Sequence, residues 1–315
     1  MKALLIVNPV SGRMVITEYV NDIRSFLKKK GFSVRTFTTR SKDDARLFAE
    51  QYGGDAEMIV CCGGDGTLSE IVNGIVNLPN HPIIGYIPTG TTNDFAKNIG
   101  LNTDILKSVI HLSHGVVREM DVGCFGKKYF VYVASFGLFA RSSYATPRAL
   151  KRRFGHVAYM LTGIKELVKP KSYRITLSDD RGNMYTGDYI YGSVSNSTSI
   201  GGLLHFDKGE VDLQDGLHEV VLIRRPKNLL EFHHAIRAVF SGKYDSDLIT
   251  IFSASKVTIQ STVPIDWSLD GEHARTRRFV TIRNVPRAVR IVFPQTGGIP
   301  QKNNGNILTT RKNIL

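Results

Sequence analysis

Short β-like segments alternate with amphipathic segments over the first third of this 315-residue chain. Four segments have the length and composition of strands, namely residues 2–7, 32–38, 58–62 and 83–87. Apolar residues at helical spacing predict four helices, over residues 16–27, 41–51, 67–76 and 104–114. Strands and amphipathic helices in this alternation are typical of a parallel sheet covered on both faces. We therefore expect the chain to begin with an α/β domain.

The pattern changes after about Val122, where β-like runs are separated by turns and two helical candidates interrupt them. The β-like runs are 129–135, 172–177, 185–195, 218–223, 249–260 and 279–282, and the helical candidates are 147–168 and 228–240. This order predicts a second, mostly antiparallel β domain. We place the first domain at residues 1–122 and the second at 123–315, and we consider that the polar tail after about residue 294 packs back on the first domain.

The composition points to an anionic partner. The formal net charge is +13 and the isoelectric point about 9.6, which favours nucleic acid, an anionic membrane or a phosphate-bearing ligand. No recognisable nucleic-acid motif is present, so we expect no nucleic acid partner. Three cysteines give no disulfide framework, and no stretch has the ~20 apolar residues of a spanning helix. We expect a cytoplasmic protein that is soluble or peripheral to a membrane.

The segment CCGGDGTLSEIVNG, residues 61–74, converts a predicted strand into a predicted helix through a glycine-rich turn. Such a turn places free backbone N–H groups at the carboxyl edge of the sheet, where ligands bind in open α/β folds. Glycines allow close approach of an anion, and a helix N-terminus favours negative charge. Asp65 would repel a bare phosphate, so we expect it beside Mg²⁺. The alternative is a glycine turn with a capping aspartate.

Two more loops of similar composition follow other strands. They are NPVSG, residues 8–12, and PTGTTNDF, residues 88–95. All three loops lie at strand-to-helix junctions, so we expect them to meet at one edge of the sheet. Neither the P-loop pattern nor a GxGxxG at the first turn is present. The predicted phosphate site is therefore neither a P-loop nor a standard dinucleotide site.

These three segments resemble the catalytic domain of the diacylglycerol kinase family, and in particular the soluble bacterial lipid kinases of diacylglycerol kinase B type. Asp121-Val122-Gly123, Asp215-Gly216 and Asp270-Gly271-Glu272 extend the resemblance along the chain. GGDGT is shared with NAD kinases and loosely with phosphofructokinases, whereas PTGTTNDFA and the late DGE are more specific to lipid kinases. The resemblance implies a parallel-sheet nucleotide-binding domain of the NAD kinase/diacylglycerol kinase fold, followed by a β-rich lipid-substrate domain.

The resemblance also implies roles for individual residues. The ATP site would comprise Asn8, Pro9, Ser11, Gly12, Thr39, Gly63, Gly64, Asp65, Gly66, Thr67, Glu70 and Thr91. Asp65 and Asp121 would share a water-bridged Mg²⁺ network. A second, structural Mg²⁺ would be held by Asp215 and by main-chain oxygens near Asp212 and Leu217. Asp270 and Glu272 would lie near the acceptor, and one of them would be the general base.

A carboxylate makes chemical sense in that place, because a lipid hydroxyl has a very high pKa and must lose its proton to attack ATP. Each acid also has an ordinary reading. Asp270-Gly271 and Asp215-Gly216 are typical of hairpin turns, and Asp121 of a solvated or capping acid. Thr39 taken alone is a strand-end hydroxyl. Which of Asp270 and Glu272 is the base stays open at this point.

Two basic regions bear on the partner. Residues 141–174 combine nine lysines and arginines with one glutamate and interleaved apolar residues, a pattern typical of a helix on an anionic membrane or of a solvated helix face. The arginines of residues 275–290 alternate along predicted strands and form either a solvated sheet face or a second membrane candidate. A homodimer is also possible.

Three functions are consistent with these features. The first is an ATP-dependent lipid kinase, peripherally associated with the inner face of the cell membrane, that phosphorylates a membrane lipid; diacylglycerol, giving phosphatidic acid, is our first choice of acceptor. Other lipid acceptors are a sphingoid base or ceramide, a polyprenol and phosphatidylglycerol. The second function is an NAD kinase, against which PTGTTNDFA and DGE argue. The third is a non-enzymatic basic module.

Overall fold

The computed structural model describes residues 1–12, 14–138, 171–197, 199–200, 204–205, 212–228, 230–231, 238 and 247–295. The helix expected over 147–168, most of that expected over 228–240, most of the basic region 141–174 and the tail after residue 295 lie outside these ranges. Among the described residues, no helix is both long and apolar enough to span a bilayer.

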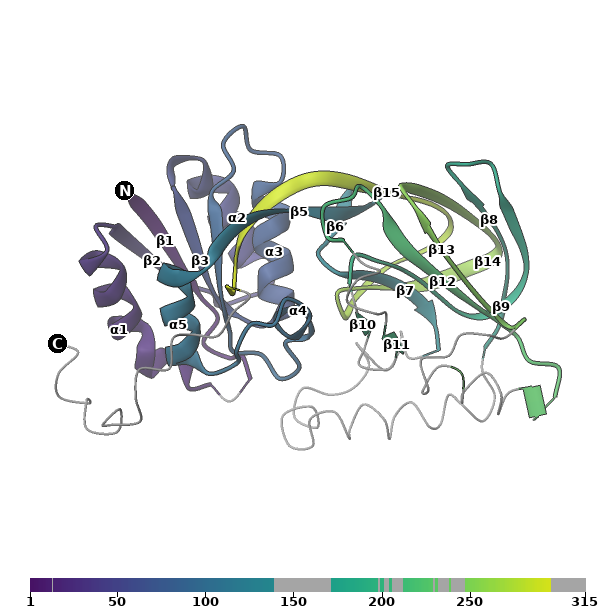
Figure 1. Ribbon diagram of the computed structural model, residues 1–315, viewed down its shortest axis with the longest axis horizontal. Helices are drawn as coiled ribbons and strands as arrows, with labels where there is room; N and C mark the ends of the chain where they lie inside the picture. The colour runs from purple at the N-terminus through teal and green to yellow at the C-terminus, as the bar shows by residue number, and fades with distance from the viewer. Residues whose placement is uncertain are drawn as a thin grey trace.

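The first half of the molecule is a layered α/β structure (Figure 1). Its strands are β1 (Lys2–Val7), β2 (Ser33–Thr38), β3 (Met58–Gly63) and β4 (Ile83–Pro88), which pair in parallel in the order β4-β3-β1-β2. Its helices are α1 (Ile16–Lys29), α2 (Asp44–Tyr52), α3 (Asp65–Ile75), α4 (Asp94–Asn98) and α5 (Ile105–His114), with a short 3₁₀ turn, η1 (Gly53–Asp55).

Alternate residues of the central strands bury their side chains on opposite faces of this sheet. Leu5 and Val60 contribute to a core with α1 and α5, whereas Ile6 and Ile59 contribute to a core with α2 and α3. Helices therefore cover both faces, as the apolar strands require. The three cysteines are buried and free.

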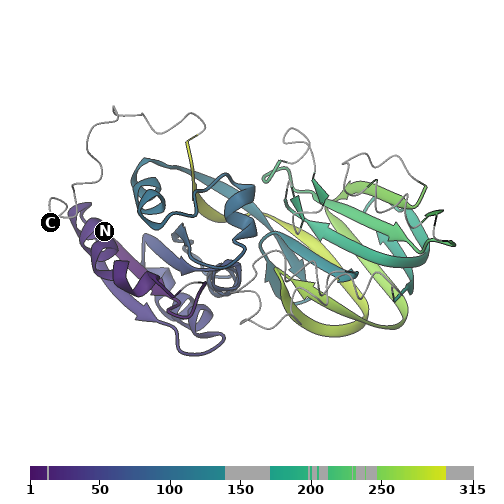
Figure 2. The ribbon, with the colours of Figure 1, turned by 90° about the horizontal axis from the view of Figure 1, so that it is seen from below.

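The described part of the second half consists almost entirely of strands (Figures 1 and 2). They are β6 (Lys128–Phe130), β7 (Val133–Gly137), β8 (Tyr173–Asp179), β9 (Met184–Ser195), β10 (Ser199–Ile200), β11 (Leu204–His205), β12 (His218–Arg224), β13 (Ile249–Ala254) and β14 (Lys256–Leu269). Except for β10 and β11, which pair with each other, they join one continuous sheet by antiparallel pairs. Trp267 lies in their core against the rings of Phe125 and Phe136.

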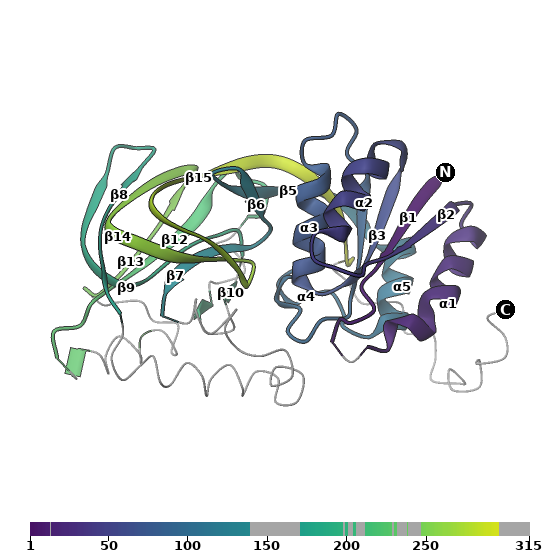
Figure 3. The same ribbon diagram turned by 180° about the vertical axis from the view of Figure 1, so that it is seen from behind.

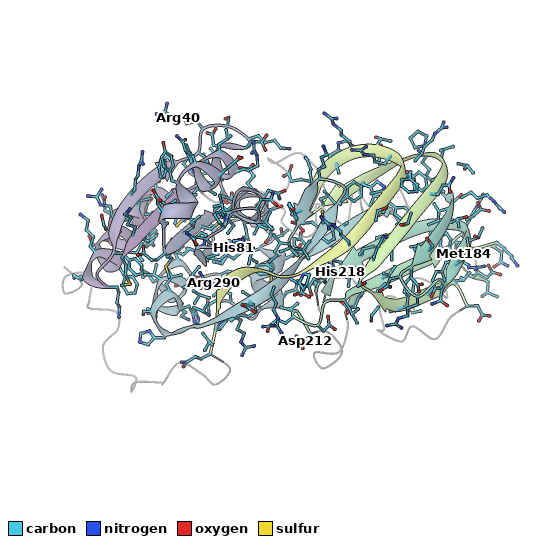
Figure 4. All side chains as sticks on the ribbon, turned by 90° about the horizontal axis from the view of Figure 1, so that it is seen from above. Arg40, His81, Met184, Asp212, His218 and Arg290 are labelled. Carbon is cyan, nitrogen blue, oxygen red and sulfur yellow. The ribbon has the colours of Figure 1, made fainter. Side chains whose placement is uncertain are left out.

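Two long strands connect the halves (Figure 1). β5 (Val116–Phe125) and β15 (Glu272–Phe293) pair antiparallel with each other, and Arg290 and Ile291 of β15 pair in parallel with Ile83 and Ile84 of β4. The Arg290 guanidinium donates to the carbonyl of His81 at this junction (Figure 4). Residue 122, where we place the domain boundary, lies inside β5.

Candidate active site

The loops that follow β1, β2, β3 and β4 open into one cleft of about 1270 Å³. The cleft gathers ten of the twelve predicted nucleotide-binding residues: Asn8, Pro9, Ser11, Gly12, Thr39, Gly64, Gly66, Thr67, Glu70 and Thr91. The other two, Gly63 and Asp65, are buried and do not line it. The carboxyl ends of parallel strands meet at one edge, which explains why loops so distant in sequence converge.

Two glycines let the loops after β3 and β4 touch backbone to backbone. A Cβ on Gly90 would lie 2.7 Å from the Cα of Gly64, so Gly90 has no room for a larger residue, and a Cβ on Gly64 would be a tight 3.1 Å from the Cα of Gly90. Gly64 is the N-cap of α3, and no side chain caps that helix. The first N–H groups of α3 are therefore suited to an anion such as phosphate. The amide of Asn8 donates to the hydroxyl of Thr67 at 2.9 Å and ties the β1 loop to this turn.

Five lysines and arginines that the sequence did not predict also line the cleft. Two of them, Lys127 and Lys128, lie before and in β6, and the other three are Arg40, Lys42 and Arg46. These three belong to the loop after β2 and the first turns of α2. Figure 4 shows Arg40 at the edge of the first half. With the hydroxyls and the uncapped helix, the five basic side chains make the cleft suitable for a triphosphate. These residues therefore fit a bound ATP.

Asp65 does not face the cleft. Its oxygens accept hydrogen bonds from the N–H groups of Asp94 at 2.9 Å and Phe95 at 3.2 Å, the first turn of α4. The side chain is 9% exposed. Burial and the neighbouring carboxylate of Asp94 raise the pKa of Asp65 to about 7. Asp65 thus joins the GGDGT turn to the PTGTTNDFA loop.

Asp121 is fully buried in β5. One carboxylate oxygen accepts from the N–H of Gly216 and the other from the N–H of Arg287, both at 2.7 Å. These bonds hold the 213–217 loop and β15 together. The carboxylates of Asp65 and Asp121 thus each accept hydrogen bonds from a different pair of backbone N–H groups.

Asp215 lies in the 213–217 loop, and Asp212 directly precedes this loop. Asp215 accepts from the N–H of Leu217 at 2.8 Å, and Asp212 from that of Gln214 at 3.0 Å. Such bonds, two residues along the chain, are those of Asx turns. Within the described ranges, no three His, Cys, Asp or Glu side chains form a group that could hold a metal ion. The predicted Mg²⁺ ligands are therefore bonded within the protein and do not form a ready metal site.

Asp270 forms the turn between β14 and β15 with a φ of 48° and is 4% exposed. Its carboxylate accepts from three consecutive N–H groups, those of Val131 at 2.7 Å, Tyr132 at 3.0 Å and Val133 at 3.1 Å. The hydroxyl of Ser69 also bonds to it, and burial raises its pKa. Because the N–H groups of residues 131–133 bond to Asp270, they are not free to pair with a neighbouring strand. This accounts for the gap between β6 and β7, where we expected one strand.

Glu272, two residues later, lies in the cleft. It comes from the second half, and its Oε1 is 3.6 Å from the point where a Cβ on Gly66 would lie. Its carboxylate forms an ion pair with Lys42 of the first half at 3.5 Å. The two predicted acids therefore differ: Asp270 is buried and fully bonded, and Glu272 is exposed across from the GGDGT turn.

A clasp between α3 and β6 fixes the two halves beside the cleft. The Asn73 amide donates to the carbonyl of Tyr129 at 2.8 Å, and its oxygen accepts from the Tyr129 N–H at 2.9 Å. The hydroxyl of Tyr129 donates to Asn77. Because the GGDGT turn is at the start of α3, these hydrogen bonds fix the position of the second half relative to that turn.

Some of the site residues that were not predicted have a signal in the local sequence, and others have none. Asp94 lies inside PTGTTNDFA, and an acid in a loop expected to bind phosphate indicates that the acid has a structural role there. Asn73 closes the CCGGDGTLSEIVNG segment but contacts a residue 56 positions away. Lys42 depends on a cross-cleft contact, and nothing in the local sequence predicts it.

Comparisons with known proteins agree with this arrangement. Residues 2–125 match the family model described as the diacylglycerol kinase catalytic domain, and residues 132–293 match the YegS C-terminal NAD kinase beta sandwich-like domain. A diacylglycerol kinase of Bacillus subtilis (strain 168) is 31% identical over 301 residues, 93% of this chain and 97% of that protein. A diacylglycerol kinase of Staphylococcus aureus (strain JH9) is 30% identical over 276 residues, 86% of each.

Solved structures share the fold at lower identity. A diacylglycerol kinase from Bacillus anthracis str. Sterne superimposes with a TM-score of 0.72 at 20% identity, covering 93% of this chain and 97% of that one. An NAD kinase from Archaeoglobus fulgidus in complex with ATP gives 0.53 at 15% identity, covering 94% of each chain. The fold and the cleft together define a lipid kinase with an NAD kinase-like β sandwich. The chain belongs to the diacylglycerol kinase family.

Proposed function

We propose that the enzyme transfers the γ-phosphoryl group of ATP to the free hydroxyl of diacylglycerol and forms phosphatidic acid and ADP. The names of the relatives at about 30% identity support this acceptor. The observation that carries the chemistry is Glu272, which the second half presents to the GGDGT turn across the cleft. The donor binds on the first half, and the acceptor approaches from the second.

In this mechanism the loops after β1, β3 and β4 orient the triphosphate. The acceptor hydroxyl attacks the γ-phosphorus, its proton passes to a Glu272 carboxylate oxygen, and the bond to the bridging β,γ-oxygen breaks with ADP as leaving group. Glu272 is preferred to Asp270 as the base because a base must reach the hydroxyl. Asp270 acts as a positioning residue: its bonds to the 131–133 backbone fix the turn that carries Glu272.

Mg²⁺ remains part of the proposal, since metal ions generally neutralise the charge that develops in phosphoryl transfer. The expected ligands Asp65, Asp121, Asp215 and Asp212 already accept backbone hydrogen bonds. We therefore derive no step through the metal. We likewise propose association with an anionic membrane at the inner face of the cell membrane, without assigning an oligomeric state.

A single assay tests the acceptor. Radiolabelled ATP is incubated with the enzyme and mixed micelles of diacylglycerol, ceramide, a sphingoid base, a polyprenol or phosphatidylglycerol, with NAD as a soluble alternative, and each reaction is repeated with EDTA. We expect label in phosphatidic acid, and only without EDTA. Label in another lipid would show that the acceptor is that lipid and not diacylglycerol. Label in NAD would show that the enzyme is an NAD kinase.

Two substitutions test the assignment of the base. Glu272→Gln should lower kcat at least ~10²-fold, the usual contribution of a general base, with unchanged melting temperature and unchanged affinity for ATP. Asp270→Asn should lower the melting temperature as well as kcat, because one of the two buried acceptor oxygens becomes an NH2 group that faces a backbone N–H donor. If Glu272→Gln retains near-normal turnover, Glu272 is not the base.

A further inference from the structure

The first part of the long strand β15 carries exposed side chains, which begin in the cleft. Its inward residues Ala274, Val280 and Ile282 are buried in the core of the second half. The exposed residues of this stretch begin with His273, which lines the cleft, and include Arg275, Arg277, Arg278, Phe279 and Arg283, with two shifts of register against β14 beside Arg277. Figure 3 shows β15 curving around the second half before it crosses to the first.

An aromatic ring in this stretch is exposed to solvent. Phe279 is 60% exposed, although it lies within a strand. It pairs with Gln260 of β14, and the irregularity that follows Gln260 includes Val263, which is 42% exposed. The apolar ring of Phe279 is thus available to a partner, although one exposed ring does not by itself make a binding site.

Basic side chains surround the ring. Arg275, Arg277, Arg278 and Arg283 of β15 and Lys256, which pairs with Arg283, are all exposed. None of the five forms an ion pair with another residue of the described ranges. Two acids lie nearby, Asp266, which accepts from Thr276, and Asp180, which accepts from Ser255; both keep their negative charge and are outnumbered by the five basic side chains. The surface therefore carries a net positive charge.

We propose that this surface, the basic strip formed by Lys256, Arg275, Arg277, Arg278, Phe279 and Arg283, docks the enzyme on an anionic lipid bilayer. Arginines contact the headgroup phosphates, and Phe279 enters the headgroup boundary. A second copy of the chain does not suit the strip, because two such surfaces repel each other. The inference rests on the proposed function, since an acceptor embedded in a bilayer requires the enzyme to come to it.

The strip also has the right position for that role. Phe279 is seven residues from Glu272 along one strand, which corresponds to roughly 23 Å at ~3.3 Å per residue. Docking through the strip therefore places the bilayer surface within one strand length of the proposed base. A diacylglycerol partly lifted from the bilayer would have a short path to the cleft.

The test is sedimentation with vesicles of phosphatidylglycerol and phosphatidylcholine that contain neither ATP nor diacylglycerol. The triple variant Arg275→Gln, Arg277→Gln, Arg283→Gln should bind about 100-fold more weakly than the wild type at low salt. A matched control, Arg24→Gln, Lys28→Gln, Lys30→Gln on α1, removes the same charge from exposed positions of the first half and should change binding less than threefold. Phe279→Thr should weaken binding about tenfold, also at high salt, where charges are screened.

The outcomes separate this proposal from the proposed function. Both strip variants should keep full activity on a short-chain diacylglycerol dispersed in detergent. If both strip variants bind vesicles as tightly as the wild type, the strip is not the docking surface. The same conclusion follows if the α1 control loses as much vesicle affinity as the strip variant, since binding would then depend on net charge alone. If the wild type phosphorylates no lipid but the vesicle results hold, the proposed function fails and the docking surface stands.

Discussion

At the scale of single residues, the environment of Asp65 strongly disfavours its ionised form. Its carboxylate is buried, faces the carboxylate of Asp94, and receives two backbone N–H groups that offset only part of the cost. A carboxyl whose pKa is about 7 in the folded state and about 4 in the unfolded state binds its proton more tightly when folded. Its contribution to stability is therefore full below about pH 4 and is lost as the pH rises toward 7.

This gives a prediction for Asp65→Asn. The variant keeps one acceptor for the α4 N–H groups and cannot ionise, so its melting temperature relative to wild type should rise between about pH 4 and pH 7 and level off above pH 7. The difference between the two proteins is the quantity to measure by calorimetry, because Glu219 also has a pKa raised by burial to about 7 and contributes equally to both. Asp94→Asn is the control: it removes one charge and should move the transition to lower pH. A difference independent of pH would contradict the pKa of Asp65.

Ten of the residues that the family resemblance assigned to the nucleotide line one cleft, and their binding of a nucleotide stays a prediction. The sequence did not predict the partner of each acid, because an acid near a phosphate loop can face solvent, metal or backbone N–H groups. For Asp65, Asp121 and Asp270 the outcome depends on N–H groups at least 29 positions away along the chain. Local sequence carries no record of those contacts.

At the scale of elements, α3 links the phosphate turn to the second half. It begins at Asp65, two residues before the predicted start; Asn73 lies in its last turn, and Asn77 follows its C-cap Val76. We predict that Asn73→Ala destabilises the protein by about 1–3 kcal/mol, because the Tyr129 N–H and C=O lose their partner. Amide hydrogen exchange in β6 should accelerate at the same time.

The control for this prediction is Asn77→Ala. Asn77 is exposed and accepts a hydrogen bond from the Tyr129 hydroxyl, so its loss should cost less than about 0.5 kcal/mol. Urea unfolding measures both changes. If the two variants lose equal stability, or if β6 exchanges no faster in Asn73→Ala, the clasp does not hold the halves together.

Elements with a clear period were predicted closely, and the others were missed for physical reasons. β1 was predicted with its observed bounds, and α5 within one residue of its start, where the Asp104 side chain caps the helix through Lys107 N–H. α4 has five residues, too few for a helical pattern. β5 and the second part of β15 lie where exposed and buried residues do not alternate regularly, since their environment changes from one half of the molecule to the other.

At the scale of the whole molecule, one of the three clusters of buried residues in the described ranges extends through both halves. This cluster contains Ile59 and Leu68 of the first half together with Val133 and Val221 of the second. β5 and β15 continue through both halves and pair over most of their common length. A boundary at residue 122 therefore separates strands that depend on each other, and sequence patterns do not reveal such shared strands because each half looks complete by itself.

The last prediction follows from that shared core: the halves should unfold together. Trp267 is the only tryptophan and lies in the second half, whereas Cys61 and Cys62 are buried in β3 of the first. In a Cys124→Ser variant, tryptophan fluorescence and thiol reactivity therefore report on different halves. Their urea midpoints should coincide, as a two-state transition requires, and a fragment of residues 1–122 should not fold, since β4 and β5 would lack β15. Separate midpoints, or a folded fragment, would show that the first half stands alone and that the clasp and the crossing strands serve only to orient the cleft.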